Sequence, residues 1–307
     1  MAEPPFGAVL AGGESSRYGS PKPLARVAGR RIVDRVVAAL RTVVPDVIVS
    51  ANDPSLFRDL GLPIHPDERP GLGPLAGIYT TLLRARDAGR PGILAVAGDM
   101  PFPSSELLAL LAYTAFGDAH GPASGRNGDS YGYSYWYSHW YSVAASVAAS
   151  GLDPDLDASP DSGLSPDRND GPDTDPHRDT DPSTRTDTDT DPGPPDIALP
   201  ASPGPRGVEP LFAAYRTTCL PAIEAALAAG DRRMIGFHER VRVRTIPVEV
   251  VESLCDPSVA FLNVNTPGDR ERAEAVAARA EKAGGPTPGP GSHRRADGAV
   301  ESSEGEG

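Results

Sequence analysis

The sequence is poor in cysteine and contains no long apolar run. Its 2 cysteines, Cys219 and Cys255, form no CxxC pair and lack metal-ligand spacing, which excludes a disulfide framework and a zinc module. No stretch approaches the ~18 apolar residues that a membrane helix needs, and the amino-terminal MAEPPFGAVLAGG has no basic leader region. We therefore expect two reduced structural thiols in a soluble, cytoplasmic protein that has no membrane partner.

Glutamate and lysine are both missing between residues 118 and 205, where 16 aspartates face only 4 arginines. This segment therefore carries −12 of the formal net charge of −13, and the rest of the chain is nearly neutral. A near-neutral body without a basic stripe argues against nucleic acid as a partner. The acidity belongs to one segment and says nothing about an active site.

The segment 118–195 has the composition of an insertion. The aromatic and serine repeat SYGYSYWYSHWYS is followed by a tract of Asp, Thr and Pro with almost no Leu, Ile, Val or Phe. Such a tract cannot bury enough apolar surface to offset its chain entropy. We predict that 118–195 is a disordered, low-complexity insertion, with a local hairpin or a sticky patch as the alternative for the aromatic repeat. Residues 284–307 are predicted to form a flexible tail.

Strand and helix patterns alternate in residues 1–117. The apolar run at 93–97 is continuous, as expected of a strand buried on both faces of a parallel sheet, and Ser104 or Ser105 is a plausible N-cap for the helix that follows. Alternation of this kind predicts an α/β fold with a three-layer, doubly wound, mostly parallel sheet. The expected strands are 6–11, 47–50 and 93–97, and the expected helices are 31–44, 75–88 and 104–116.

The globular pattern resumes after the insertion. Residues 1–117 and 196–283 together make about 200 residues, which is the size of one ordinary domain, so we predict a single interrupted domain. The expected strands of the second part are 196–200, 209–215, 241–251 and 260–264, and the expected helices are 220–229 and 267–282.

A glycine-rich loop, LAGGESSRYGSPK at residues 10–22, follows the first predicted strand. Gly12 and Gly13 let backbone amides approach a phosphate closely, and Arg17 and Lys22 add positive charge where a triphosphate would lie. The loop matches neither GxGxxG nor GxxxxGK[ST], which disfavours a dinucleotide site and a Walker loop. On its own, the pattern is also compatible with a turn that carries surface charges.

Asp99 follows the predicted strand 93–97. Ligands of open α/β sheets bind beyond the carboxyl ends of the strands, so this carboxylate is well placed for a ligand. Mg²⁺ takes a few protein oxygens and completes its coordination with phosphates and water. The sequence therefore makes Asp99 the candidate Mg²⁺ ligand, with a turn or helix-cap residue as the alternative.

These motifs, taken together, resemble those of the molybdenum cofactor guanylyltransferases, within the nucleotidyltransferase superfamily and its Rossmann-like fold. LAGGESSRYGSPK is similar to the signature LAGGxSxRxGxxK, and further segments agree in the same order on both sides of the insertion. These are VSAN (49–52), HPDERPGLGPLAGI (65–78), AVAGDMPF (95–102), EPLFAAY (209–215) and FLNVNTPGD (261–269). The chain departs from the family pattern at Tyr18, where Met is frequent, and at Pro21, where Asp is frequent.

The resemblance implies roles for individual residues. Lys22, Arg17 and Asp99 would be catalytic, with Asp99 binding Mg²⁺. Asn263 and Asn265 would order the metal or the second substrate, although an Asx turn explains them equally well. Asp67 would accept hydrogen bonds from the guanine edge or the ribose. The implied nucleotide-binding residues are Leu10, Ala11, Gly12, Gly13, Lys22, Asn52, Asp67 and Asp99.

The implied reaction is transfer of GMP from GTP to the terminal phosphate of molybdopterin, with release of pyrophosphate and no covalent intermediate. Molybdoenzymes and cofactor-insertion proteins would be further partners. A cytidylyltransferase, or another NTP transferase acting on a cofactor or sugar phosphate, is the alternative, although the pair Gly12-Gly13 after Leu10-Ala11 favours guanine within the resemblance. A non-catalytic nucleotide-binding scaffold with an interaction insertion is the alternative of another class.

Overall fold

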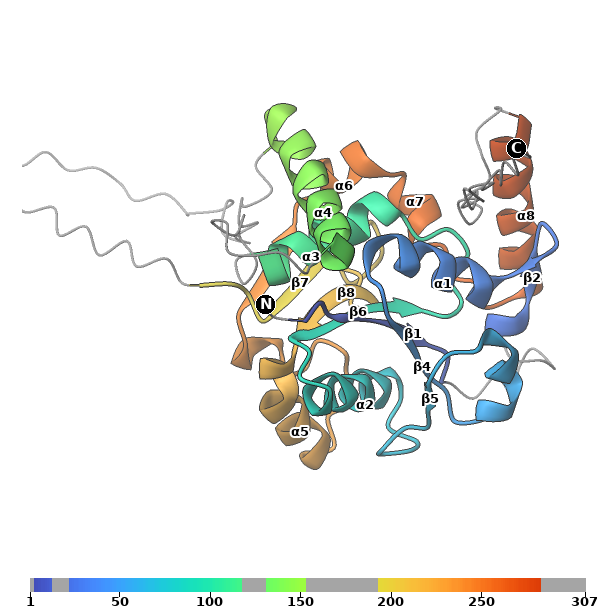
Figure 1. The fold of residues 1–307 in the computed structure, drawn as a ribbon. Helices are drawn as coiled ribbons and strands as arrows, with labels where there is room; N and C mark the ends of the chain where they lie inside the picture. The colour runs from blue at the N-terminus through green and yellow to red at the C-terminus, as the bar shows by residue number, and fades with distance from the viewer. Residues whose placement is uncertain (1–2, 13–21, 118–130, 153–192, 283–307) are drawn as a thin grey trace, which may run out of the picture.

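The computed structural model describes residues 3–12, 22–117, 131–152 and 193–282 (Figure 1). Its centre is a seven-stranded sheet in the order β5-β4-β1-β6-β8-β7-β9. All neighbouring strands are parallel except β8, which is antiparallel to β6 and β7, so the prediction of a mostly parallel sheet is confirmed. The strands are β1 (Phe6–Leu10), β4 (Val47–Ser50), β5 (Ile64–His65), β6 (Gly92–Ala97), β7 (Ile197–Pro200), β8 (Phe212–Arg216) and β9 (Val243–Ile246).

Helices cover both faces of the sheet and give the three predicted layers (Figure 1). One face packs against α1 (Ile32–Val43) and α3 (Ser105–Phe116), and the other against α2 (Pro74–Asp87) and α5 (Leu220–Ala228). Ser104 caps α3, because its hydroxyl accepts a hydrogen bond from the Leu107 amide at 3.1 Å. No helix in the described part of the chain is long and apolar enough to cross a membrane.

The central strands contribute side chains to two separate hydrophobic cores, one on each face of the sheet. In β1, Val9 packs into the core beneath α1 and α3, whereas Ala8 and Leu10 pack into the core beneath α2 and α5. Successive side chains of a strand point to opposite faces, so a strand covered on both sides must be apolar throughout. This explains why the continuous apolar runs at β1 and β6 were recognisable as central strands.

Part of the predicted insertion is a helix. Tyr131–Ala149 form α4, so the prediction that 118–195 is disordered throughout is wrong for these residues. Trp140 is completely buried, and its indole nitrogen donates a hydrogen bond to the carbonyl oxygen of Val43 at 2.8 Å. The hydroxyl of Tyr141 donates to the Gly117 carbonyl at 3.0 Å. The rest of the segment, 118–130 and 153–192, and the predicted tail 284–307 lie outside the described residues.

A helical stripe explains why α4 packs on the body. Trp140, Val143, Ala144 and Val147 are all buried, and their spacing of three and four residues places them on one face of a helix. They join the core that contains α1 and α3. The repeated serines and tyrosines suggested low-complexity sequence and concealed this short stripe.

Of the two strands predicted after residue 240, the first is wrong in part and the second is wrong. The expected strand at 241–251 ends at Ile246, and Val248–Leu254 form helix α6. Pro247 precedes the helix, where its missing N–H and fixed φ disfavour continuation of the strand. Pro257–Ala260 form helix α7, so no strand forms at 260–264. Short apolar runs cannot be assigned to strand or helix by periodicity alone.

Candidate functional site

Asp67 and Asn52 form a hydrogen-bonded pair beyond the carboxyl ends of β4 and β5. The side-chain amide of Asn52 donates to Asp67 Oδ2 at 3.0 Å, and its side-chain oxygen accepts from the Asp67 backbone amide at 3.1 Å. The hydroxyl of Ser50 donates to Asp67 Oδ1 at 2.8 Å. Both carboxylate oxygens are therefore held in place, and each retains lone pairs for a ligand.

The start of the glycine-rich loop lies against this pair. A Cβ added to Gly12 would lie 3.5 Å from Asp67 Oδ2, so the loop backbone passes close to the carboxylate. Ala11 donates its amide to the Ser50 carbonyl at 2.8 Å, and Leu10 accepts from the Gly98 amide at 2.9 Å. These bonds fix the strand end from which the loop departs. Gly13 and Arg17 lie outside the described residues.

Lys22 lies close enough to Asp99, at the end of β6, for its charge to act on that carboxyl. Burial raises the pKa of Asp99 above its ordinary value, and the charge of Lys22 acts in the opposite direction. Lys22 begins the 3-10 turn Lys22–Leu24, and its ammonium group donates to Asn265 Oδ1 at 2.7 Å. The structure therefore brings together three residues from distant parts of the sequence.

The two late asparagines differ in their contacts. Asn265 accepts from Lys22, whereas the side-chain amide of Asn263 donates to the carbonyl of Phe261 at 3.2 Å, a local contact that is not an Asx turn. The backbone between them is tied to the site, because Val264 donates its amide to the Asp99 carbonyl at 2.9 Å. Asn265 is thus the better candidate for a functional residue.

Glu209 was missed as a candidate from the sequence. It precedes β8, and the antiparallel pairing of β8 with β6 places it near the end of β6 and therefore near Asp99. Burial raises the pKa of the Glu209 carboxyl. The hydrogen bond from the Leu211 amide and the charge of Arg206 oppose this shift, and the negative charge of Asp99 adds to it. The signal for this residue in the sequence is a single acidic side chain directly before a buried apolar strand, within the EPLFAAY motif.

Comparison with known proteins adds to this geometry. The family model described as the MobA-like NTP transferase domain matches residues 7–243. The chain belongs to this family. A probable molybdenum cofactor guanylyltransferase of Pelotomaculum thermopropionicum is 28% identical over 88% of the chain and 92% of the relative. A protein of the same description from Carboxydothermus hydrogenoformans is 25% identical over 86% of the chain and 92% of its own length.

Solved structures of low identity show the same fold. Molybdopterin-guanine dinucleotide biosynthesis protein A from Archaeoglobus fulgidus aligns with a TM-score of 0.55 at 20% identity, covering 89% of this chain and 99% of that one. A 4-diphosphocytidyl-2C-methyl-D-erythritol synthase from Anaerococcus prevotii aligns with a TM-score of 0.50 at 11% identity, over 91% and 97% of the two chains. These two structures therefore share the fold of this chain.

Asp99 and Glu209 are the carboxylates near the carboxyl edge that could take part in holding a metal ion. No group of three or more His, Cys, Asp or Glu side chains that could hold a metal occurs within the described residues. Mg²⁺ needs only one or two carboxylates, because it keeps waters and takes oxygens from substrate phosphates. Asp99, with Glu209 nearby, supplies a donor set of this kind.

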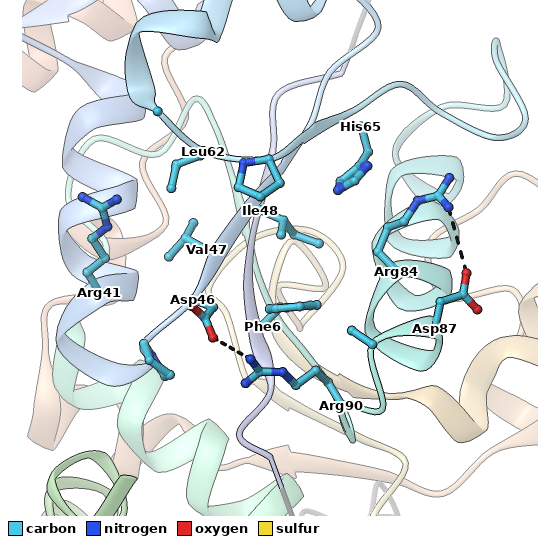
Figure 2. A pocket seen from close by; sticks show the side chains of 14 residues that line it. Phe6, Arg41, Asp46, Val47, Ile48, Leu62, His65, Arg84, Asp87 and Arg90 are labelled. Carbon is cyan, nitrogen blue, oxygen red and sulfur yellow. Dashed lines mark hydrogen bonds and ion pairs between the residues drawn. The ribbon is translucent and has the colours of Figure 1, made fainter. Parts of the chain in front are cut away.

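A cavity of about 670 Å³ lies at the opposite edge of the sheet, where β1 and β4 begin (Figure 2). Two of its arginines are already neutralised. Arg90 pairs with Asp46 at 2.6 Å and with Glu3 at 3.1 Å, and Arg84 pairs with Glu68. Of the predicted site residues, none lines this cavity. The predicted site residues that the structure describes lie at the carboxyl edge instead.

Proposed function

We propose that the protein transfers GMP from GTP to the terminal phosphate of molybdopterin, forming the guanine dinucleotide cofactor and pyrophosphate. The observation that carries this proposal is the convergence at one edge of the sheet of Lys22, Asp99 and Asn265 beside the Asn52–Asp67 pair. The full-length relatives named as molybdenum cofactor guanylyltransferases support the choice of nucleotide and acceptor.

In this proposal, the nucleotide lies across the strand ends. Asp67, fixed by Ser50 and Asn52, accepts hydrogen bonds from guanine or ribose, and the backbone at Gly12 borders the same position. Lys22 donates to phosphate oxygens in place of its contact with Asn265. A phosphate acceptor is ionised at neutral pH, so its attack on the α-phosphorus needs no strong general base.

Asp99, assisted by Glu209, would hold Mg²⁺. The ion would neutralise charge on the transferring phosphoryl group and on the leaving pyrophosphate. Lys22 contributes a second positive charge, which is preorganised because the Lys22 turn and the Asn265 loop are fixed by the protein before the nucleotide binds. Pyrophosphate release is the chemical signature of this reaction.

The test is a comparison of four nucleotides. Purified protein with Mg²⁺ and molybdopterin is incubated with GTP, CTP, ATP or UTP, and pyrophosphate release is measured. We expect release with GTP, at a level at least about tenfold above the others, because guanine recognition should be worth one good hydrogen-bonded contact. Release with CTP alone would support the same mechanism with CTP as the substrate in place of GTP. No release with any nucleotide would contradict the proposed function.

Asp67→Asn is expected to raise KM for GTP by about tenfold, since an amide replaces one of the two acceptor oxygens with a donor. Steady-state kinetics with GTP and with inosine triphosphate would distinguish the base from the ribose. If Asp67 accepts from guanine, the variant loses more affinity for GTP than for inosine triphosphate, which lacks the exocyclic amino group. Equal losses for both nucleotides would assign Asp67 to the ribose, and an unchanged KM would remove it from the nucleotide site.

A further inference from the structure

A second cavity, of about 520 Å³, opens beside the carboxyl-edge site. One wall is the loop between β7 and β8, which ends at Glu209, and the other is the segment from α7 to the start of α8 (Pro267–Lys282). Two of its lining residues connect it to Asp99. The negative charge of Asp99 raises the pKa of Glu209. Asn263 directly precedes Val264, whose amide donates a hydrogen bond to the Asp99 carbonyl. The cavity therefore adjoins the place where phosphoryl transfer would occur.

The β7–β8 loop holds Arg206 at the mouth of this cavity. Ser202 donates its amide to the Gly207 carbonyl at 2.9 Å, and Gly207 donates to the Gly204 carbonyl at 3.0 Å. Gly207 has a φ of 71°, a value that favours glycine and tightens the turn. Prolines at 203 and 205 restrict the same loop further. The position of Arg206 is thus set by the backbone before any ligand arrives.

Helix α8 holds a second arginine, Arg272, in the opposite wall. Thr266 and Asp269 form a capping box at the start of α8: the Thr266 amide donates to Asp269 Oδ2 at 2.9 Å, and the Asp269 amide donates to the Thr266 hydroxyl at 3.2 Å. Asp269 Oδ2 also accepts from the Asn265 amide at 3.1 Å. The charge of Arg272 lowers the pKa of Asp269, whose carboxylate is engaged with the helix terminus.

Arg206 and Arg272 line the cavity together with two carboxylates, and the charge of Arg206 lowers the pKa of Glu209 while that of Arg272 lowers the pKa of Asp269. Within the described part of the chain, neither guanidinium makes an ion pair or a hydrogen bond, and both side chains are exposed at the cavity. In the larger cavity of Figure 2, by contrast, Arg84 and Arg90 are both bound to carboxylates. The lining of the smaller cavity is mixed, and Val208, Phe261 and Leu262 contribute to its apolar part.

We infer that this cavity binds the acceptor, and that Arg206 and Arg272 recognise its phosphomonoester while the apolar part of the lining supports a flat organic body. The inference rests on the proposed function, in which GMP is transferred to a phosphorylated acceptor. A guanidinium binds phosphate through charge-assisted hydrogen bonds, and two guanidiniums on opposite walls specify where the phosphate lies. Arg206 and Arg272 are thus specificity-determining residues for the acceptor.

The experiment measures binding of 7,8-dihydroneopterin monophosphate and of dephosphorylated dihydroneopterin to the full-length protein by calorimetry. Arg206→Ala and Arg272→Ala are each expected to weaken binding of the phosphorylated compound by about tenfold, the size of one charge-assisted contact, and to leave the dephosphorylated compound unaffected. Arg279→Ala is the matched control, because Arg279 is an exposed arginine on the same helix that does not line the cavity. Its affinity for both compounds should equal that of the wild type.

Transfer kinetics provide an independent readout. With GTP and molybdopterin, the two cavity variants should raise KM for molybdopterin and leave KM for GTP unchanged. Equal binding of the phosphorylated compound by wild type and both variants would overturn the inference, as would a selective rise in KM for GTP. If the wild type transfers no GMP but the variants still lose affinity for the phosphorylated pterin, the proposed function fails and the anion-binding cavity is retained.

Discussion

Asp99→Asn is expected to lower the rate of nucleotidyl transfer by about 10²–10³-fold, the usual cost of losing one preorganised electrostatic group at a transition state. The side chain keeps its shape and loses its charge, so the proposed ligand for Mg²⁺ and the negative charge that interacts with Lys22 disappear together. Pyrophosphate release at saturating GTP and molybdopterin measures the effect. Asp87→Asn, in an exposed carboxylate at the other edge of the sheet, should be as active as the wild type.

A stability measurement separates this loss from misfolding. Because burial raises the pKa of Asp99, the folded state disfavours the charged carboxylate relative to the unfolded chain. In the absence of divalent metal, this group therefore lowers stability as pH rises from the ordinary carboxyl pKa through the raised one, and the cost persists at neutral pH. Asp99→Asn should unfold at the same or a higher urea concentration at pH 7. An inactive variant that is also destabilised would contradict the assigned role, as would a fully active one.

Trp140→Ala is expected to destabilise the protein by about 3–5 kcal/mol, the cost of removing a large aromatic side chain from a packed core. Trp140 is completely buried, and its truncation also leaves the carbonyl oxygen of Val43 without its hydrogen-bond donor. Urea unfolding, followed by circular dichroism, gives the change in the free energy of unfolding. This prediction tests whether α4 belongs to the domain core.

Two further substitutions sharpen that test. Trp140→Phe keeps most of the apolar contact and removes the hydrogen bond to Val43, so it should cost about 1 kcal/mol beyond the change in volume. Ser138→Ala, at an exposed position of the same helix, should change stability by less than about 0.5 kcal/mol. If Trp140→Ala behaved like Ser138→Ala, the helix would not be packed on the body in solution.

The parts of the fold that were predictable are those with strong local patterns. The strands at β1, β4 and β6 are apolar because helices cover both of their faces, and the N-cap at Ser104 is a short-range signal. The two-residue strand β5, and the hairpin of β2 (Arg26–Val27) and β3 (Arg30–Arg31), are too short to show any period. Their pairing depends on tertiary contacts.

The site was predictable to the extent that single residues carried its chemistry. Asp67 and Asp99 each follow a strand at the carboxyl edge, which a motif reading can anticipate. The contact between Lys22 and Asn265 joins residues 243 positions apart, and no local pattern encodes it. The proximity of Glu209 to Asp99 depends on the reversed direction of β8, which periodicity does not indicate because parallel and antiparallel central strands look alike.

The acidic segment 118–195 is inserted at one end of the sheet, and the candidate site lies at the opposite end. The chain leaves α3 at Gly117 and re-enters β7 after Asp196, and Arg216 links this region by donating to the Ala115 carbonyl. Both junctions lie at the amino end of β6. Gly92, the first residue of β6, pairs with Arg216, and Ile197, the first residue of β7, pairs with the neighbouring Tyr215. A strand of six residues spans about 20 Å, more than two screening lengths of about 8 Å at physiological salt. The length and charge of the acidic segment 118–195 can therefore change at these junctions with little effect on the electric potential at the carboxyl edge. The proposed anionic substrates would bind at that edge.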